Sequence, residues 1–164
     1  MMNETYNPEI KNEAAPTKLG TFREKITQFE DMMGQLPQVE RGDECGELKH
    51  HFGDGLYVRE LIAPAGYLIV TKIHKLTHPV FVMTGEVSVL TEEGVKRFKA
   101  PYWMMTPAGT KRICYVHSES IWITVHPNPE DTQDMDEIEM KVIAKDFEDA
   151  TLLQADINKL LKEV

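Results

Sequence analysis

The sequence predicts an all-β core, an antiparallel β-sandwich or barrel, with α-helices on its N- and C-terminal flanks. Between residues 48 and 127, short runs of β-branched and aromatic residues such as YLIVTKI and IWITVH alternate with turn signals such as GDG, PAG and TPAG. These turns recur about every eight to twelve residues and leave no room for crossover helices, so the strands should be antiparallel. Helical patterns occur only outside this block.

The N-terminal flank divides into an arm and a helix. Residues 1–20 are polar and hold few large apolar groups, so we expect an arm that is mobile or bound to a partner. From Thr21 apolar residues recur at helical spacing, and Thr21 with Glu24 forms a capping-box start. The sequence therefore predicts an amphipathic helix over 21–36, and a loop completes the segment 21–47.

The C-terminal flank, residues 128–164, is acidic. It carries eleven acidic and four basic residues and supplies most of the formal net charge of −9. An apolar stripe predicts a final amphipathic helix over 151–163, whereas DMDEIEMKVIAKDFED fits no single pattern. An acidic run of this kind is typical of a solvated helix face.

Composition excludes several classes of function. The 164 residues are 41% hydrophobic and 27% charged, which is typical of one globular domain with flanking arms. Basic residues do not cluster, so we expect no binding to nucleic acid, and anionic membranes are disfavoured for the same reason. The two cysteines form no CxxC pair, and neither a signal peptide nor a long apolar stretch occurs. These features indicate a cytoplasmic protein.

The stretch TKIHKLTHPVFVMTGEVSVL holds the first candidates for chemistry. His74 and His78 stand four residues apart, but Pro79 and the neighbouring strand formers argue against a helix here. On a strand, Lys72 and His74 would share one face. A turn at residues 76–77 would then bring His78 back beside them.

Further candidates lie on the last predicted strand. Trp122, Thr124 and His126 alternate along it and would line one cavity if this face is internal. Two imidazoles alone rarely hold a metal tightly, so a third ligand is needed, and His126 is the best candidate. Trp122 and Thr124 would contact a bound small molecule.

Two segments resemble the motifs of the cupin superfamily, whose members are small double-sheet jelly-roll barrels. PAGYLIVTKIHKLTHPVFVMTG aligns with the first motif without gaps. His74 takes the second-histidine position and Gly85 that of the closing glycine. Lys72 and His78 replace the first histidine and the glutamate. In APYWMMTPAGTKRICYV, which is similar to the second motif, Arg112 stands at the histidine position. The resemblance covers about half of the chain, the predicted barrel.

The resemblance implies an antiparallel double-sheet jelly-roll barrel with a divalent metal (Zn, Fe, Mn or Ni) in its interior. Cupins usually hold the metal with three histidines and one carboxylate, whereas here His74, His78 and His126 would hold it. Arg112 and Lys72 would orient the anionic group of a small ligand. The glutamate position has no carboxylate to act as a general base, so the reaction is unassigned and the chain need not be an enzyme.

Two other functions stay open. Short cupin-like chains are familiar among bacteriophage gene products, so the resemblance also implies a non-catalytic virion component whose barrel and arms contact viral assembly proteins. Alternatively, the same lysine, histidines and arginine could sequester a small anionic metabolite without metal. Each residue also has a structural interpretation: the histidines as satisfied core residues, Lys72 and Arg112 as surface charges, and Trp103 with Trp122 as barrel packing.

The flanking helices predict self-association. Their apolar faces carry more surface than a closed barrel needs for its own core. We therefore expect a homo-oligomer, most simply a dimer.

Overall fold

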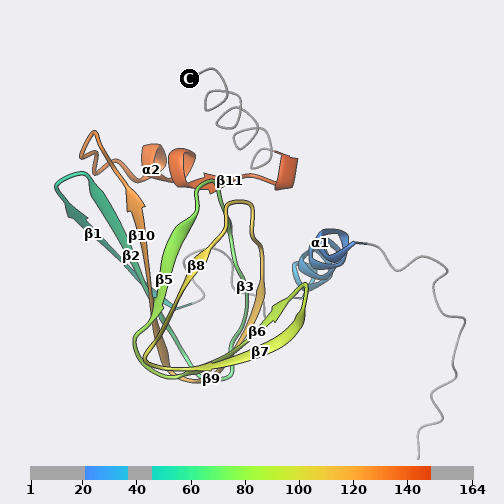
Figure 1. Ribbon diagram of the computed structural model, residues 1–164. Helices are drawn as coiled ribbons and strands as arrows, with labels where there is room; N and C mark the ends of the chain where they lie inside the picture. The colour runs from blue at the N-terminus through green and yellow to red at the C-terminus, as the bar shows by residue number, and fades with distance from the viewer. Residues whose placement is uncertain (1–20, 37–45, 149–164) are drawn as a thin grey trace, which may run out of the picture.

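The computed structural model describes residues 21–36 and 46–148, which form two helices and eleven strands (Figure 1). In chain order the elements are α1 Phe22–Met33, β1 Glu47–Gly53, β2 Leu56–Ala63, β3 Leu68–Val70, β4 Ile73–His74, β5 His78–Val82, β6 Glu86–Thr91, β7 Gly94–Lys99, β8 Tyr102–Thr106, β9 Ile113–Ser118, β10 Ser120–Pro127, α2 Met135–Val142 and β11 Ile143–Ala144. The predicted arm 1–20, most of the loop after α1 and the predicted helix 151–163 lie outside the described residues.

Two antiparallel sheets face each other across the interior (Figure 1). The five-stranded sheet has the order β1-β2-β10-β5-β8, and the four-stranded sheet has the order β3-β9-β6-β7. A third, two-stranded sheet pairs β11 with β4. The prediction of an antiparallel all-β core with flanking helices is therefore confirmed. Among the described residues, neither helix is long and apolar enough to cross a membrane.

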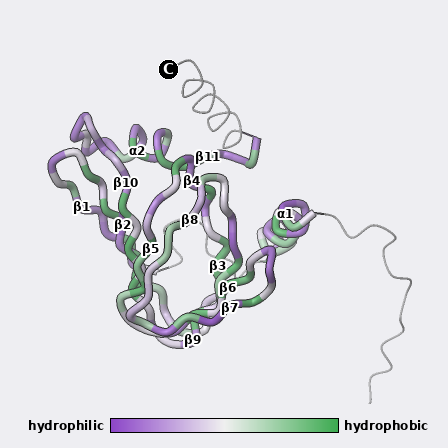
Figure 2. The backbone as a smooth tube through the Cα atoms, viewed as in Figure 1, coloured by the Kyte–Doolittle hydropathy of each residue, from purple (hydrophilic) through white to green (hydrophobic). Residues whose placement is uncertain are grey.

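The main core lies between the two sheets. Its buried members are small or β-branched side chains that face inward from both sheets: Ala63, Ile69, Val87, Val89, Cys114 and Val116. Leu61, Tyr67, Phe98 and Trp122 pack against them. Hydrophobic residues accordingly gather on the strands, whereas the connection between β10 and α2 is hydrophilic (Figure 2).

Helix α1 begins as the sequence predicts and ends earlier. The side chain of Thr21 accepts a hydrogen bond from the Glu24 backbone, and the Glu24 side chain accepts one from the Thr21 backbone, which completes the capping box. The helix ends at Met33 because Gly34 forms the C-cap and the next residues make turn-type hydrogen bonds. Ile26 is the buried side chain of this helix.

The segment without a clear sequence pattern forms α2 and β11. Asp134 caps α2 by accepting hydrogen bonds from the first turn, and Ile138 and Val142 pack against Tyr57 of β2. Directly after the helix, Ile143 pairs with His74 in the β4–β11 sheet. Part of the acidic C-terminal extension is thus built into the barrel.

The outer face of the five-stranded sheet is apolar near its β8 edge. Trp103 pairs with Phe81, and Met105 pairs with Pro79. Trp103 is 62% exposed and Met105 is 52% exposed. The expectation that Trp103 packs inside the barrel is therefore wrong. Side chains alternate along β8, and the residues on either side of Trp103 take the inward positions while Trp103 faces outward. Trp122 does pack against the core.

Candidate metal centre

Three histidines from three different strands meet at one end of the interior. His74 is the second residue of β4, His78 is the first of β5, and His126 lies near the end of β10. One potential ligand atom from each lies within 4.8 Å of the others. The ring centroids are 4.2 Å apart for His74 and His78, and 4.8 Å apart for each of these and His126. His78 and His126 are each only 2% exposed.

The bend between β4 and β5 brings His74 and His78 together. Backbone hydrogen bonds to residues outside the bend hold it in place: Gly109 donates to the carbonyl of His74 at 2.9 Å, and Lys75 of the bend donates to the carbonyl of Val142 at 2.8 Å. Nδ1 of His78 lies 2.9 Å from the carbonyl oxygen of Leu76. Because a carbonyl only accepts, Nδ1 carries the proton and donates, and Nε2 keeps a lone pair for a ligand.

Strand parity places His126 beside them. Trp122, Thr124 and His126 pair with Leu61, Arg59 and Tyr57 of β2, so all six side chains share the inward face of the five-stranded sheet. Nε2 of His126 lies 3.2 Å from Oγ1 of Thr124, and its ring stacks near that of Tyr57 with centroids 6.1 Å apart. Thr124 therefore orients the third imidazole.

All three imidazoles are neutral at neutral pH. Burial, followed by the neighbouring His78 and His126 rings, lowers the pKa of His74 to about 2. Burial and then His78 lower the pKa of His126 to about 3. Burial also lowers the pKa of His78. Neutral imidazole is the form that binds a metal.

The donor set fits a transition metal. Nδ1 of His74 is buried and has no hydrogen-bond partner among the described residues. A buried polar atom of this kind is costly unless something binds it. Three convergent imidazoles are typical of a zinc site that keeps an open position, and imidazole ligands also suit iron and nickel. Within residues 21–36 and 46–148, no carboxylate belongs to this cluster.

Positive charge surrounds the histidines. Arg59 lies close enough to lower the pKa of both His74 and His126, and Lys72 adds to this effect on His74. Lys72 forms an ion pair with Glu139 of α2. The Lys72 ammonium group is therefore paired with α2, although the Lys72 side chain also lines the cavity between the sheets.

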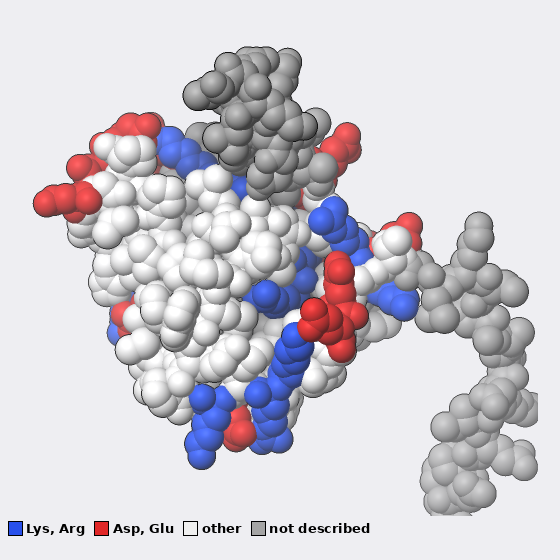
Figure 3. All heavy atoms as spheres, viewed as in Figure 1, with Lys and Arg blue, Asp and Glu red and all other residues white. Residues whose placement is uncertain are grey.

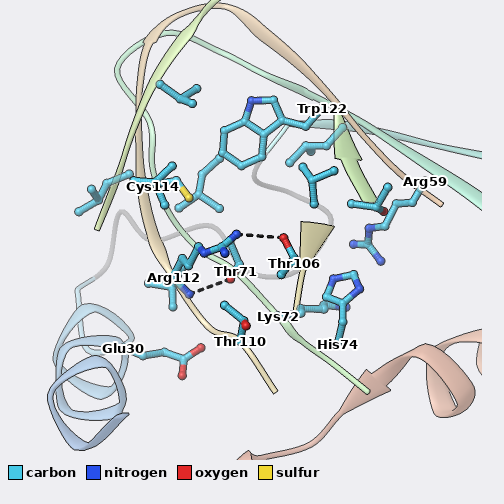
Figure 4. A pocket seen from close by; sticks show the side chains of 18 of the residues that line it. Glu30, Arg59, Thr71, Lys72, His74, Thr106, Thr110, Arg112, Cys114 and Trp122 are labelled. Carbon is cyan, nitrogen blue, oxygen red and sulfur yellow. Dashed lines mark hydrogen bonds between the residues drawn. The ribbon is translucent and has the colours of Figure 1, made fainter. Parts of the chain in front are cut away.

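A cavity of about 660 Å³ extends from His74 and His78 into the space between the sheets. Figure 4 shows His74 and Trp122 toward opposite ends of this view, with Arg112 and Thr106 between them. Nη1 of Arg112 donates to Oγ1 of Thr106 at 3.0 Å and contacts Sδ of Met104 at 3.5 Å. No described carboxylate pairs with this half-buried guanidinium.

The predicted site residues thus gather in one region. The cavity is lined by Lys72, Trp122, Thr124 and Arg112 together with His74 and His78, and His126 joins these two histidines in the cluster. Sequence reasoning missed residues on β2 and β8, namely Tyr57, Arg59 and Thr106. The alternation of Tyr57 and Arg59 is visible in LYVREL, but only the register of β2 with β10 shows that these side chains face the histidines. Thr106 is placed by its pairing with His78.

Comparison with known proteins finds similarity in structure alone. No family model and no curated protein matches the chain. A cupin-2 domain protein from Shewanella frigidimarina is 11% identical with a TM-score of 0.42, over 60% of this chain and 91% of that one. KdgF from a Halomonas species is 15% identical with a TM-score of 0.45, over 58% and 90%. An acetylacetone dioxygenase from Acinetobacter johnsonii is 16% identical with a TM-score of 0.41, over 56% and 74%.

Solved structures similar to this chain therefore include cupin-domain proteins, the superfamily that its two turn motifs predict. At these identities and TM-scores, any function has to rest on the residues of this chain.

Proposed function

We propose that the chain binds one divalent transition metal through His74, His78 and His126, and a small anionic ligand beside it. The observation that carries this proposal is the convergence of three neutral imidazoles within 4.8 Å, one with a buried nitrogen that lacks a described partner. Zinc is the first metal to test, followed by iron, manganese and nickel. When bound, the metal would act as a Lewis acid.

Charge balance supports the anionic ligand. Three neutral histidines leave both charges of a divalent metal uncompensated, and Arg59, Lys72 and Arg112 add positive charge nearby. Glu139, the acidic group that contacts Lys72, is already engaged in that ion pair. A single anion from solution would both complete the metal coordination and pair with Arg112. Two carboxylates of α1, Glu30 and Asp31, also line the cavity, and Glu30 is paired with Lys111. Neither belongs to the histidine cluster, so we assign no reaction.

Metal analysis tests the centre directly. We expect purified protein to carry about one equivalent of divalent metal, which His74→Ala should remove. Loss of a ligand should weaken metal binding more than about 100-fold, because loss of a residue that merely supports a ligand costs 10- to 100-fold. Added metal at about 100 times its Kd should stabilise the wild-type fold by about 2.7 kcal/mol.

His117→Ala provides the matched control. Nε2 of His117 forms a hydrogen bond with Oγ of Ser88 at 2.7 Å on the four-stranded sheet, and His117 lies outside the histidine cluster. The proposal is wrong if no metal binds and chelator leaves the unfolding temperature unchanged. It is equally wrong if His117→Ala lowers metal affinity as much as His74→Ala.

A second candidate, self-association as a dimer, is supported by the outer face of β5 and β8. Pro79, Phe81, Trp103 and Met105 form an uncharged patch there. Figure 3 shows an uncharged expanse over the region where Figure 1 labels these strands, with charged side chains at its margins. A two-fold axis would place such a face against its own copy without opposing like charges.

Native mass measurement tests the dimer. At micromolar concentration we expect twice the chain mass, and Trp103→Glu should give the monomer. Val95→Glu, another exposed apolar position on a different sheet, is the control and should leave the dimer intact. A monomeric wild-type chain would exclude this proposal. The viral assembly role and the cytoplasmic or virion location stay predictions, because no feature of the described residues is specific to them.

A further inference from the structure

We propose that the anionic ligand is a monocarboxylic acid with an apolar body, bound with its carboxylate at Arg112 and its hydrocarbon part between the two sheets. This inference rests on the anion-binding role proposed above for Arg112, and it does not depend on the metal. It names a ligand class and an orientation within the cavity.

The charge requirement comes from Arg112. Its guanidinium has five N–H donors, and both of its side-chain contacts to described residues use Nη1. Lys72, by contrast, is paired with Glu139. A half-buried guanidinium without a carboxylate partner is costly, and one singly charged, planar carboxylate satisfies its fork geometry. A phosphate dianion would bring a second charge for which Arg112 has no match.

The apolar requirement comes from the walls. Beyond Arg112 the cavity is lined by aliphatic, thiol and indole groups from both sheets: Leu61, Ile69, Val80, Val82, Val87, Val89, Cys114 and Trp122. Six of these belong to or pack against the main core cluster. Protein interiors are close-packed, and an apolar void destabilises the fold in proportion to its volume. A hydrocarbon body that fills this space would recover those contacts.

A polyhydroxylated acid does not suit the same walls. Each hydroxyl placed among valine and isoleucine side chains would lose its hydrogen bonds to water without gaining a partner. The polar side chains of the lining lie instead around Arg112, which Thr71 and Thr106 contact, and on the α1 segment, which contributes Glu30, Asp31 and Gln35. Figure 4 shows Glu30, Thr71 and Arg112 away from the end where Trp122 lies. The geometry therefore separates a polar end for the carboxylate from an apolar end for the body.

Calorimetric titration of the full chain with a series of carboxylates tests this inference. From butanoate through hexanoate to octanoate, affinity should rise about fourfold for each added methylene. Gluconate has six carbons and the same carboxylate as hexanoate, and it should bind at least about tenfold more weakly. 1-Octanol, which lacks the charge, should bind about 10- to 100-fold more weakly than octanoate.

Two variants locate the two ends of the ligand. Arg112→Gln should lower octanoate affinity to that of 1-octanol and leave 1-octanol binding unchanged, whereas Arg97→Gln, which changes a surface guanidinium paired with Glu86, should alter neither. Val89→Phe fills part of the cavity and should weaken octanoate at least tenfold while butanoate binding is retained. This second variant keeps the test decisive if Arg112→Gln does not fold.

Performing each titration with chelator and with added zinc separates this inference from the metal proposal. If metal-free protein binds octanoate with the expected chain-length and Arg112 dependence, the inference stands even where no metal is found. If zinc binds but affinity is flat along the series, or gluconate equals hexanoate, the inference is wrong and the metal centre stands.

Discussion

The two sheets present different inward faces to one cavity. The five-stranded sheet contributes the polar groups, among them Arg59, His78, Thr106 and His126. The four-stranded sheet contributes buried apolar side chains such as Val87 and Val116. The five-stranded sheet holds two of the three histidines, whereas the four-stranded sheet supplies most of the buried core side chains. The two properties should therefore be separable by mutation.

Gly85, which lies between β5 and β6 where the chain passes from one sheet to the other, should give the largest effect. Its φ of +81° disfavours a side chain, and an added Cβ would lie 2.3 Å from the carbonyl oxygen of Glu119. Gly85→Ala should lower the free energy of unfolding by about 3 kcal/mol or more and impair metal binding as well.

Gly66→Ala is the control for this change. Gly66 also has a positive φ, +87°, but nothing lies within 4 Å of its added Cβ. It should cost only about 1–2 kcal/mol, which chemical denaturation would measure. If both variants lost the same free energy of unfolding, the close contact between position 85 and the Glu119 carbonyl would not explain the effect.

Val116→Ala should weaken the core packing that the four-stranded sheet supplies and leave the histidine cluster unchanged. Val116 is fully buried in the main core, and deleting its two methyl groups should lower the free energy of unfolding by about 2 kcal/mol. Metal affinity, measured by competition with a chromogenic chelator, should stay within about twofold of wild type. A large loss of affinity would show that packing and chemistry are not separable.

The histidines predict how stability depends on pH in metal-free protein. Because folding lowers their pKa values from about 6.5, the unfolded chain binds protons that the folded chain does not as the pH falls below about 6.5. Stability is therefore complete above that pH and is lost toward pH 3, by up to about 1.4 kcal/mol per pH unit for each histidine.

Urea denaturation in chelator at pH 7, 6 and 5 measures this slope. His74→Ala removes one of the three titrating groups and should give a shallower pH dependence than wild type. Identical slopes in the two proteins would contradict the assignment of His74 as a neutral buried imidazole.

Glu139→Gln should have the smallest effect. The Lys72–Glu139 ion pair lies at the surface, where such pairs contribute about 0–1 kcal/mol. We expect a loss of stability below about 1 kcal/mol and little change in metal affinity, because Glu139 is outside the histidine cluster. A loss of metal binding comparable to that of His74→Ala would instead make Glu139 part of the centre.

The sequence predicts the parts of this molecule that have a period or a turn signal. The alternation of Trp122, Thr124 and His126 predicts the inward face of β10, and the bend predicted at residues 76–77 brings His78 beside His74. Both features depend on local backbone sterics, which the sequence reveals. The role of Arg59 depends on the register between β2 and β10, strands far apart in the chain. A two-residue strand such as β11 has no period at all, so its pairing with β4 has no signal in the sequence.

That pairing ties the C-terminal extension to a single imidazole. His78 and His126 belong to a five-stranded sheet, whereas His74 lies in a strand of two residues with two cross-strand pairs, Ile143 with His74 and Ala144 with Ile73. Residues 143 and 144 therefore support His74 alone among the three histidines, whereas the strands of the five-stranded sheet support the other two.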